Sequence, residues 1–309
     1  MGSHFIHYLL ANFSDLKVIN LDALTYAGRR QNNADLKNHP NFRFIKGDIR
    51  DFPLLQKIMC QNRINGVVNF AAHSHVDRSI IDPQEFISTN VGGATSLFWA
   101  SLKQGVKKFL QVSTDEVYGP TLNTSFKEAD KLSPTSPYAA SKAAADLVGR
   151  SFFKTYGLPL IVVRSANNFG PRQFPEKLIP RLTVRALRHK KLPVYGQGKN
   201  LRDWIYVKDF CVACGLAFFS GTPGEIYNIS AQQKHSNLNV AKAILADLNL
   251  PLSAISYIKD RPANDSGYGM DSQKMTRLGF CPQFNFFYAL KATVFWYQKH
   301  PEFWQPLVN

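Results

Sequence analysis

Five residues in the middle of the chain carry groups that could act together on one substrate. Thr114, Asp115 and Glu116 are consecutive, and Tyr138 and Lys142 follow about one helix later. A phenol beside an ammonium suits proton removal during hydride transfer, because the positive charge lowers the pKa of the phenol. Two further carboxylates indicate that another proton is removed and that water leaves. The set therefore predicts an enzyme that oxidises a hydroxyl group and then eliminates water.

The predicted secondary structure brings these residues to one pocket. Tyr138 and Lys142 are four residues apart in a helical pattern, so their side chains share one helix face. Thr114 ends an apolar strand, and a hydroxyl at the carboxyl end of a parallel strand faces the ligand crevice. A second Tyr-x-x-x-Lys, Tyr195 and Lys199, lies among glycines where no helix is expected, so we interpret it as chance.

Short apolar runs alternate with helical patterns through the first half of the chain. This alternation, with strands that are apolar throughout, predicts an α/β fold with a doubly wound, Rossmann-like parallel sheet. The predicted strands are 17–21, 42–45, 66–70, 108–112 and 160–163, and the predicted helices are 53–62, 83–104, 137–156, 180–189, 239–248 and 287–300.

Several residues at strand ends could hold a dinucleotide. Asp22 follows a strand and lies 20 residues after Gly2, the usual distance from a glycine motif to the acid that binds the adenosine ribose. A carboxylate there favours NAD, because it would repel a 2′-phosphate; a capping or turn role is the alternative. Asp48 is placed to meet the adenine edge. Ala71 and Ala72 offer small side chains where a backbone must approach a pyrophosphate, although a tight strand end explains them equally well.

The beginning of the chain does not fit a complete fold of this kind. Residues 1–4 enter a helical pattern at once, and only Gly2 could belong to a glycine-rich loop. The backbone N–H groups that bind a pyrophosphate come mostly from that loop. We therefore expect an N-terminally truncated Rossmann-like domain that lacks its first strand and most of the loop.

Prolines and glycines become frequent after residue 170. This change predicts a nucleotide-binding domain at 1–170, to which the chain returns at about 203–230, and a smaller substrate-binding lobe made mainly by 171–309.

The composition of the chain narrows the kinds of molecule that it could bind. The net charge of +15 is spread along the chain, and no aromatic residues alternate with basic ones as in an RNA-binding sheet, so nucleic-acid binding would rest on charge alone. An anionic small substrate such as a sugar nucleotide explains a positive cleft as well. No apolar run reaches membrane-spanning length, and the start does not resemble a secretory signal. Four cysteines suggest a reducing cytoplasm, and Cys211 and Cys214 read as core thiols of an apolar helix, so we predict no metal site.

Five sequence stretches carry a family resemblance. They are QVSTDEVYG at 111–119, YAASK at 138–142, RSANNFGP at 164–171, FPEKLIP at 174–180 and NLRDWIYV at 200–207. Together they resemble the dTDP-glucose 4,6-dehydratases, which are extended short-chain dehydrogenase/reductase enzymes. The resemblance extends from Gly2 to about Met270 and includes NLDALTYAG at 20–28 and AHSHVDRS at 72–79. The Thr-Asp-Glu triplet distinguishes the dehydratases, since epimerases keep the Tyr and Lys without the two carboxylates.

The resemblance implies a role for each catalytic residue. Tyr138 takes the proton of the glucose 4-hydroxyl while hydride leaves C4 for NAD, and Thr114 hydrogen-bonds the 4-oxygen. Glu116 then removes the acidified C5 proton, and Asp115 protonates the departing 6-hydroxyl. Hydride returns to C6. Lys142 also holds the nicotinamide ribose.

The resemblance also implies binding residues and an assembly. The expected cofactor-binding residues are Asp22, Asp48, Ile49, Ala71, Ala72, Tyr138, Lys142 and Asn167. The expected substrate-binding residues are His75, Asn168, Lys177, Arg202, Asn228 and Arg261. A homodimer is expected through the helices at 83–104 and 137–156.

Some alternatives remain open. The family usually has an acid where His73 stands, a His where Asn264 stands, and a bulky or basic residue near 266–267. These departures leave UDP-glucose as an alternative substrate. An epimerase or decarboxylase of the same fold is disfavoured by the carboxylate pair. A binding or regulatory protein that has lost tight NAD binding is the further alternative, although it would have no need for the complete catalytic set.

Overall fold

The centre of the molecule is a parallel sheet, as the sequence predicts. The computed structural model describes residues 1–260 and 265–308. Four strands pair in the order β3-β4-β5-β9, and every neighbouring pair is parallel. They are Gly66–Asn69, Lys108–Thr114, Leu160–Ser165 and Ile226–Ile229. Strands β5 and β9 are buried throughout, which explains why they are apolar runs without alternation.

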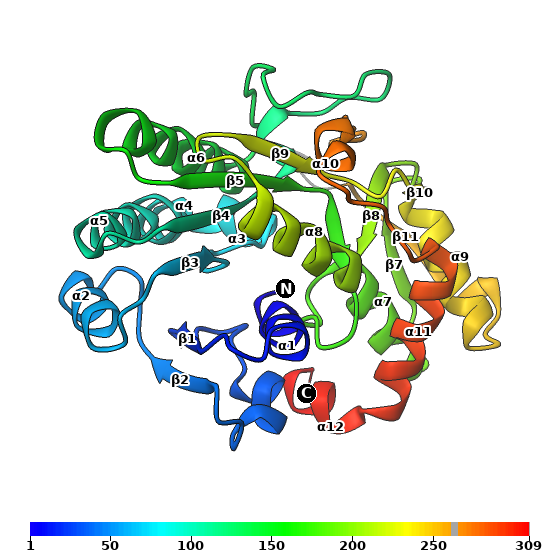
Figure 1. Cartoon of the computed structure of the whole chain (residues 1–309). Helices are drawn as coiled ribbons and strands as arrows, with labels where there is room; N and C mark the ends of the chain where they lie inside the picture. Colours follow the sequence, from blue (N-terminus) through cyan, green and yellow to red (C-terminus); the bar gives the residue numbers. More distant parts are fainter. Residues whose placement is uncertain (261–264, 309) are drawn as a thin grey trace.

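Two further parallel strands stand apart from this sheet. Strands β1 (Val18–Asp22) and β2 (Phe42–Lys46) pair with each other, and in the described residues no ladder joins them to β3. Helix α1 begins at Gly2, as the sequence predicts, and runs to Asn12. Figure 1 shows the β1–β2 pair below β3, with α1 beside it. The fold class is therefore confirmed, while the five strands predicted in the first half of the chain are divided between two sheets.

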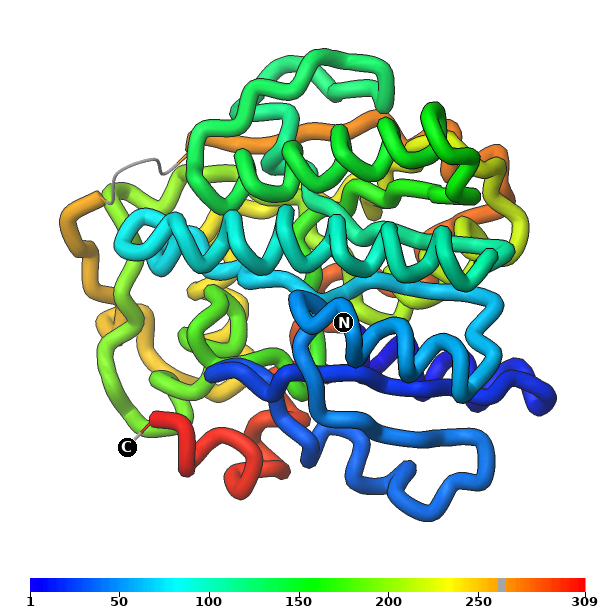
Figure 2. Tube along the Cα trace, turned by 90° about the vertical axis from the view of Figure 1, so that its left-hand side faces the viewer, coloured from blue at the N-terminus to red at the C-terminus, as the bar shows by residue number. Residues whose placement is uncertain are grey.

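Helices cover both faces of the central sheet. Helices α5 (Ala94–Gln104) and α6 (Pro137–Tyr156) lie on one face, and α8 (Val207–Ser220), with α1 packed against it, lies on the other (Figure 1). Figure 2, which looks onto the first face, shows α5 and α6 running side by side. Helix α6 has the predicted bounds because its ends are well capped: Ser136 accepts from the Ala139 N–H, and Gly157 ends the helix in the left-handed region.

The helix predicted at 83–104 is interrupted. It consists of α4 (Pro83–Phe86), a π-helical segment at Ile87–Gly93, and α5. The segment packs closely on the residue after Asp48, since a Cβ on Gly93 would lie 2.7 Å from Cγ1 of Ile49. Within the segment, Asn90 donates from Nδ2 to the His73 carbonyl oxygen and accepts from the His73 N–H. Such π-turns are frequent at functional sites.

The second half of the chain builds the smaller lobe around short strands. Strand β8 (Leu201–Tyr206) pairs with β10 (Lys234–Ser236) and β6 (Asn167–Phe169), and β7 (Leu192–Tyr195) pairs with β11 (Ile255–Ile258). In the segment 203–230, where a return of the chain is expected, α8 packs on the central sheet and β9 pairs with β5, whereas β8 lies outside that sheet. This strand pairs instead with β6, the direct continuation of the chain beyond β5.

The remaining helices surround the strands of both halves. They are α2 (Phe52–Gln61), α3 (Val76–Ile81), α7 (Leu178–Leu187), α9 (Asn237–Asp247), α10 (Gln273–Arg277), α11 (Phe286–Lys299) and α12 (Pro301–Trp304). Cys211 and Cys214 are buried, free thiols of α8, as predicted. No helix among the described residues is long and apolar enough to cross a membrane.

Candidate active site

The carboxyl end of β4 places the predicted triplet. Thr114 is the last residue of the strand, and a 3-10 turn, Asp115–Tyr118, follows immediately. The Thr114 hydroxyl accepts from the Glu116 N–H at 3.3 Å and donates to Oδ1 of Asp115 at 3.2 Å. Asp115 is buried, whereas Glu116 is half-buried. The turn therefore holds two neighbouring carboxylates in different surroundings.

Helix α6 brings the phenol and the ammonium to the same end of the sheet. Tyr138 and Lys142 are both buried, at 9% and 5% exposure. Tyr138 lies close enough to the triplet for the charges of Glu116 and Asp115 and a hydrogen bond with Thr114 to act on its hydroxyl. Nζ of Lys142 donates to the Val112 carbonyl oxygen at 2.6 Å. The structure thus brings together all five residues that the sequence singled out.

Burial dominates the electrostatics of this cluster. Burial raises the pKa of Asp115 to about 8, and the charges of Glu116 and Asp203 act in the same direction. Burial, with Glu116, also raises the pKa of Tyr138 above its usual range. The pKa of Lys142 falls to about 8 because its ammonium is buried. Asp115 is accordingly a protonated acid at neutral pH, able to donate to a leaving group.

The predicted cofactor residues lie at the carboxyl ends of parallel strands. Asp22 ends β1, and its Oδ1 accepts from the Leu24 N–H at 2.7 Å. Asp48 follows β2 and is bound by Arg50 at 2.7 Å, which helps to hold the pKa of Asp48 below its usual value. Ala71 and Ala72 follow β3 and are half-buried, and Ile49 is buried beside Asp48.

Three buried acceptor atoms in the predicted binding set have no partner among the described residues. They are Nδ1 of His75, at the start of α3, and Oδ1 of Asn167 and of Asn168, on β6. The amide nitrogen of Asn168 is already used, since it donates to Oγ of Ser165 at 2.7 Å. Unpaired buried polar atoms are rare in proteins. Their unused hydrogen-bonding capacity fits residues that receive the hydroxyl and amide groups of a cofactor and a sugar.

The predicted phosphate-binding cations lie in the smaller lobe. Lys177 precedes α7 and donates to the Ser74 carbonyl oxygen, which links this lobe to the segment before α3. Arg202, on β8, stacks over the Tyr268 ring at 4.8 Å. Its charge reaches the catalytic cluster, where it lowers the pKa of Asp115 against the larger effect of burial. Arg261 lies outside the described residues.

Asn228 has a different setting from the other predicted residues. It is fully buried on β9. Its amide donates to the Phe126 and Asp271 carbonyl oxygens, and it accepts from the Tyr118 hydroxyl at 2.8 Å. These bonds occupy the side chain within the protein, so its predicted contact with substrate would require them to rearrange.

Two neighbours of the catalytic cluster were not found from the sequence. Asp203, on β8, is buried and raises the pKa of Asp115. Tyr268 lies where the charge of Glu116 reaches it, and its hydroxyl donates to Oδ2 of Asp265 at 2.5 Å. The buried aromatic and aliphatic run Trp204–Tyr206 that follows Asp203 was a usable signal, because a carboxylate that enters the interior with it must find partners there. Nothing in the local sequence marks Tyr268.

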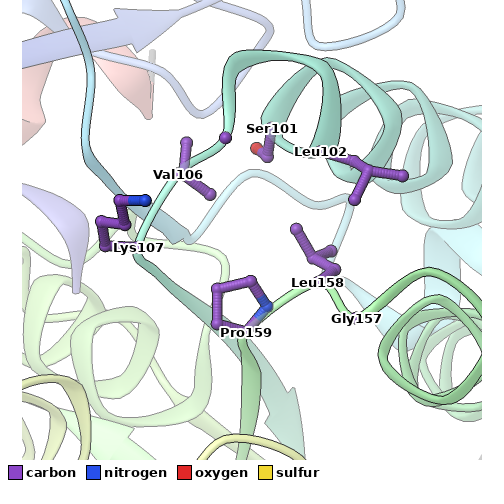
Figure 3. Close-up of a pocket in the computed structure, with 8 residues that line it drawn as sticks. Ser101, Leu102, Val106, Lys107, Gly157, Leu158 and Pro159 are labelled. Atoms are coloured by element: carbon purple, nitrogen blue, oxygen red, sulfur yellow. The ribbon is translucent and has the colours of Figure 1, made fainter.

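A cavity of about 340 Å³ lies away from this cluster. Figure 3 shows its lining, which comes from the ends of α5 and α6 and the segments that lead into β4 and β5. The cavity therefore lies at the amino ends of β4 and β5, whereas Thr114 lies at the carboxyl end of β4. Among the described residues, no group of three or more His, Cys, Asp or Glu side chains could hold a metal ion.

Comparison with known proteins agrees with this geometry. The model of the family described as GDP-mannose 4,6 dehydratase matches residues 1–293 of the chain. The chain belongs to this family. The low-salt glycan biosynthesis protein Agl12 of Haloferax volcanii is 46% identical over 96% of the chain and 95% of its own length. The dTDP-glucose 4,6-dehydratase of Streptomyces griseus is 41% identical over 100% of the chain and 94% of its own length.

Solved structures show how widely the fold is shared. A double mutant of DesIV, a dTDP-glucose 4,6-dehydratase from Streptomyces venezuelae crystallised with NAD, superposes with a TM-score of 0.96 at 41% identity, covering 99% of this chain and 96% of that one. A UDP-glucose 4-epimerase from Thermotoga maritima reaches 0.90 at 28% identity, covering 97% and 96%. Because dehydratase and epimerase share the fold, the catalytic side chains must distinguish them.

Proposed function

We propose that this protein is an NAD-dependent 4,6-dehydratase that converts dTDP-glucose to dTDP-4-keto-6-deoxyglucose. The observation that carries the proposal is the buried Asp115 beside Glu116, next to the Tyr138 hydroxyl. An enzyme that only transfers hydride needs the phenol and the ammonium. The additional acid, protonated at neutral pH, and its neighbouring carboxylate are the pair that elimination of water requires.

The first step belongs to Tyr138. Its hydroxyl oxygen removes the proton of the sugar 4-hydroxyl as hydride leaves C4, while Thr114 orients the same oxygen. When bound, NAD supplies a positively charged ring that stores the hydride and favours the phenolate. Lys142 adds a second positive charge. Its ammonium rests on the Val112 carbonyl oxygen in this structure and would turn to the nicotinamide ribose when the cofactor is present.

The second step belongs to the two carboxylates. The new 4-keto group acidifies the C5 proton, which Glu116 takes as general base. Asp115 gives its proton to the 6-hydroxyl, so the oxygen leaves as water. The two acids can divide the work because burial keeps Asp115 protonated, whereas Glu116 is half-buried. The stored hydride then returns to C6, and Glu116 returns a proton to C5, which completes the 4-keto-6-deoxy sugar.

NAD would bind along the carboxyl ends of the parallel strands β1, β2 and β3. Asp22 would hold the adenosine ribose, Asp48 and Ile49 the adenine, and Ala71 and Ala72 the pyrophosphate. Asn167, whose Oδ1 is unpartnered among the described residues, would meet the nicotinamide end. We assign this half-site to residues 1–170 with the returning α8 and β9.

Substrate binding would fall mainly to residues 171–309. Lys177 and Arg202 are cations suited to the diphosphate, with Arg261 as a third. His75 and Asn168 present unpartnered acceptors to sugar hydroxyl groups. Asn228 completes the predicted set, subject to release of its internal hydrogen bonds.

The assembly would be a homodimer through the exposed face of α5 and α6. Ile87, Leu147 and Tyr156 are 58%, 55% and 50% exposed, and Trp99 is in edge-to-face contact with Tyr156 at 5.3 Å. The two helices lie side by side (Figure 2), so one partner surface can contact both. A second copy of the same face would cover it and form a bundle of four helices. Free cysteines, two of them exposed, fit a reducing cytoplasm.

A product assay tests the proposed function. The protein is incubated with dTDP-glucose and NAD, and the 4-keto sugar is followed by its absorbance in alkali. Parallel reactions contain UDP-glucose, or dTDP-glucose without added NAD. We expect product from dTDP-glucose. Product from UDP-glucose alone would move the proposal to a UDP-sugar dehydratase. No product under any condition, with no cofactor bound, would leave a binding relic of the same fold.

A further inference from the structure

Three ionisable side chains lie in the interior directly behind the phenol. Lys142, Asp146 and Arg164 have exposures of 5%, 0% and 1%. Burying charged groups is costly unless they are paired. Oδ2 of Asp146 accepts from Nε of Arg164 at 3.0 Å and from Oγ of Ser113 at 3.0 Å. Asp146 thus pairs directly with Arg164, and its charge also acts on Lys142, one helical turn away on α6.

Helical spacing lines up this group with the catalytic residue. Tyr138, Lys142 and Asp146 are four residues apart in turn on α6, so all three side chains lie along one face. That face packs on β4, which supplies the Val112 carbonyl to Lys142 and the Ser113 hydroxyl to Asp146. Oδ1 of Asp146 is buried and has no hydrogen-bond partner among the described residues.

The positive charge of Arg164 favours the ionised form of Asp146. Its guanidinium stacks over the Tyr118 ring at 4.8 Å, and Nη1 donates to the Glu128 carbonyl oxygen at 3.3 Å. An arginine keeps its charge in proteins, and a carboxylate beside it is favoured in the ionised form. Burial raises the pKa of Asp146, and the charge of Arg164 is the largest effect that opposes it.

The carboxylate acts on Lys142 in turn. Burial lowers the pKa of Lys142 to about 8, and the charge of Asp146 opposes that fall. Asp146 is the charged group that acts on the ammonium, and Arg164 acts on Asp146 in turn. The phenol of Tyr138, one helical turn before Lys142, is reached by the charges of Glu116, Asp115 and Asp146. Asn90, which reaches α6 by donating to Oγ of Ser141, is neutral.

We propose that Asp146 is a positioning residue for this reaction: its carboxylate, anchored by Arg164 and Ser113, keeps Lys142 protonated and directed toward Tyr138. The charge of Asp146 also raises the pKa of Tyr138, and the charge of Arg164 offsets part of the negative charge of Asp146. The inference rests on the proposed function for its catalytic meaning. The effect of Asp146 on the proton affinity of Lys142 can be measured without catalysis.

The test compares Asp146→Asn with the parent protein by NMR of lysine labelled at Cε and Nζ. The Lys142 signal is assigned by its loss in Lys142→Met. We expect the titration midpoint of Lys142 to fall by about one pH unit in Asp146→Asn, which is a tenfold loss of proton affinity. The alkaline limb of the pH–rate profile should move in the same direction, and Asp146→Glu should restore both.

A matched control separates this effect from general damage to the core. Asp209, on α8, is also buried, and its carboxylate accepts from the Gln283 and Phe284 N–H groups at 3.0 and 3.1 Å. Asp209→Asn should lower stability and leave the Lys142 midpoint unchanged. An unchanged midpoint in folded Asp146→Asn overturns the proposal.

Asp146→Asn leaves Arg164 buried without its partner and could fail to fold. In that event the double variant Asp146→Asn with Arg164→Met removes both charges, and the Lys142 midpoint should still fall. An unchanged midpoint in the folded double variant overturns the proposal as well. A lowered midpoint in protein that forms no keto sugar would support the role of Asp146 and refute the proposed function. Normal turnover with an unchanged Lys142 midpoint would support the proposed function and refute the role of Asp146.

Discussion

Asp115 lies buried beside Glu116, and the negative charge of Glu116 joins burial in raising the pKa of the Asp115 carboxyl to about 8. Two adjacent carboxyl groups on one turn thus lie in different surroundings, Asp115 buried and Glu116 half-buried. Asp203 strengthens the effect from the neighbouring β8. The difference suits a reaction in which one carboxyl group must donate a proton while its neighbour accepts one.

The division of roles predicts the behaviour of Asp115→Asn. This variant keeps Tyr138, Lys142 and Thr114, so the first oxidation should proceed at a rate within about tenfold of the parent. Water loss should slow by about a hundredfold or more, because the leaving hydroxyl has no acid. NADH absorbance in a single turnover, followed by quantification of the 4-keto-6-deoxy sugar, separates the two steps. Loss of the NADH signal together with the product would contradict the role assigned to Asp115.

The same carboxyl predicts a pH dependence of stability. The folded protein holds the Asp115 proton up to about pH 8, whereas an exposed aspartate releases it near 4. The contribution of this retained proton to the free energy of unfolding is therefore complete below about pH 4 and is lost as the pH rises toward 8. Asp115→Asn should gain about 1–3 kcal/mol relative to the parent between pH 5 and pH 8. Urea unfolding of both proteins at the two pH values measures it, and a constant difference would argue against a protonated Asp115.

The sequence predicts the catalytic residues well because their chemistry is local. Thr114, Asp115 and Glu116 are consecutive, and Tyr138 and Lys142 are joined by helical spacing, so pattern alone places them. Tyr268 reaches the same cluster from far along the chain, and such contacts leave no periodic signal. The expected lowering of the Tyr138 pKa by Lys142 is wrong for this structure: Lys142 donates to the Val112 carbonyl oxygen, and burial raises the pKa of the phenol.

The arrangement of strands was harder to predict than the strands themselves. The apolar runs that became β1 and β3 were recognised within one residue, because continuous apolar runs are typical of parallel strands. Apolar character does not identify the neighbour of a strand. Strand β8 resembled a return to the main sheet and instead joined β6 and β10, where the chain leaving β5 offers a free edge.

The exposed apolar face predicts a change of assembly on mutation. Leu147, on α6, is 55% exposed within this face. Leu147→Arg should convert a dimer into a monomer, because two arginines would meet across the interface. Leu252→Arg is the matched control, since Leu252 is 58% exposed elsewhere and should leave the dimer intact. Sedimentation velocity measures the oligomeric state of the parent and of both variants. A parent protein that is monomeric at micromolar concentration would contradict the interface.

The division of the sheet predicts uneven hydrogen exchange. In the described residues, β1 and β3 each pair with a strand on one side, whereas β4 and β5 pair on both. Amides at an unpaired strand edge open more readily. Peptides that cover Val18–Asp22 and Gly66–Asn69 should therefore exchange faster than those that cover Lys108–Thr114 and Leu160–Ser165. Equal protection across all four strands would indicate a continuous sheet in solution.

The fate of the hydrogen on C4 tests the central claim most directly. The proposed cycle takes hydride from C4 and returns the same hydrogen to C6, while Glu116 exchanges the C5 proton with solvent. dTDP-glucose deuterated at C4 should therefore give a 4-keto sugar that carries deuterium in its C6 methyl group, as read by NMR and mass spectrometry. In D2O, unlabelled substrate should gain deuterium at C5. Recovery of C4-deuterated substrate, or of its C4 epimer, without any keto sugar would contradict the account.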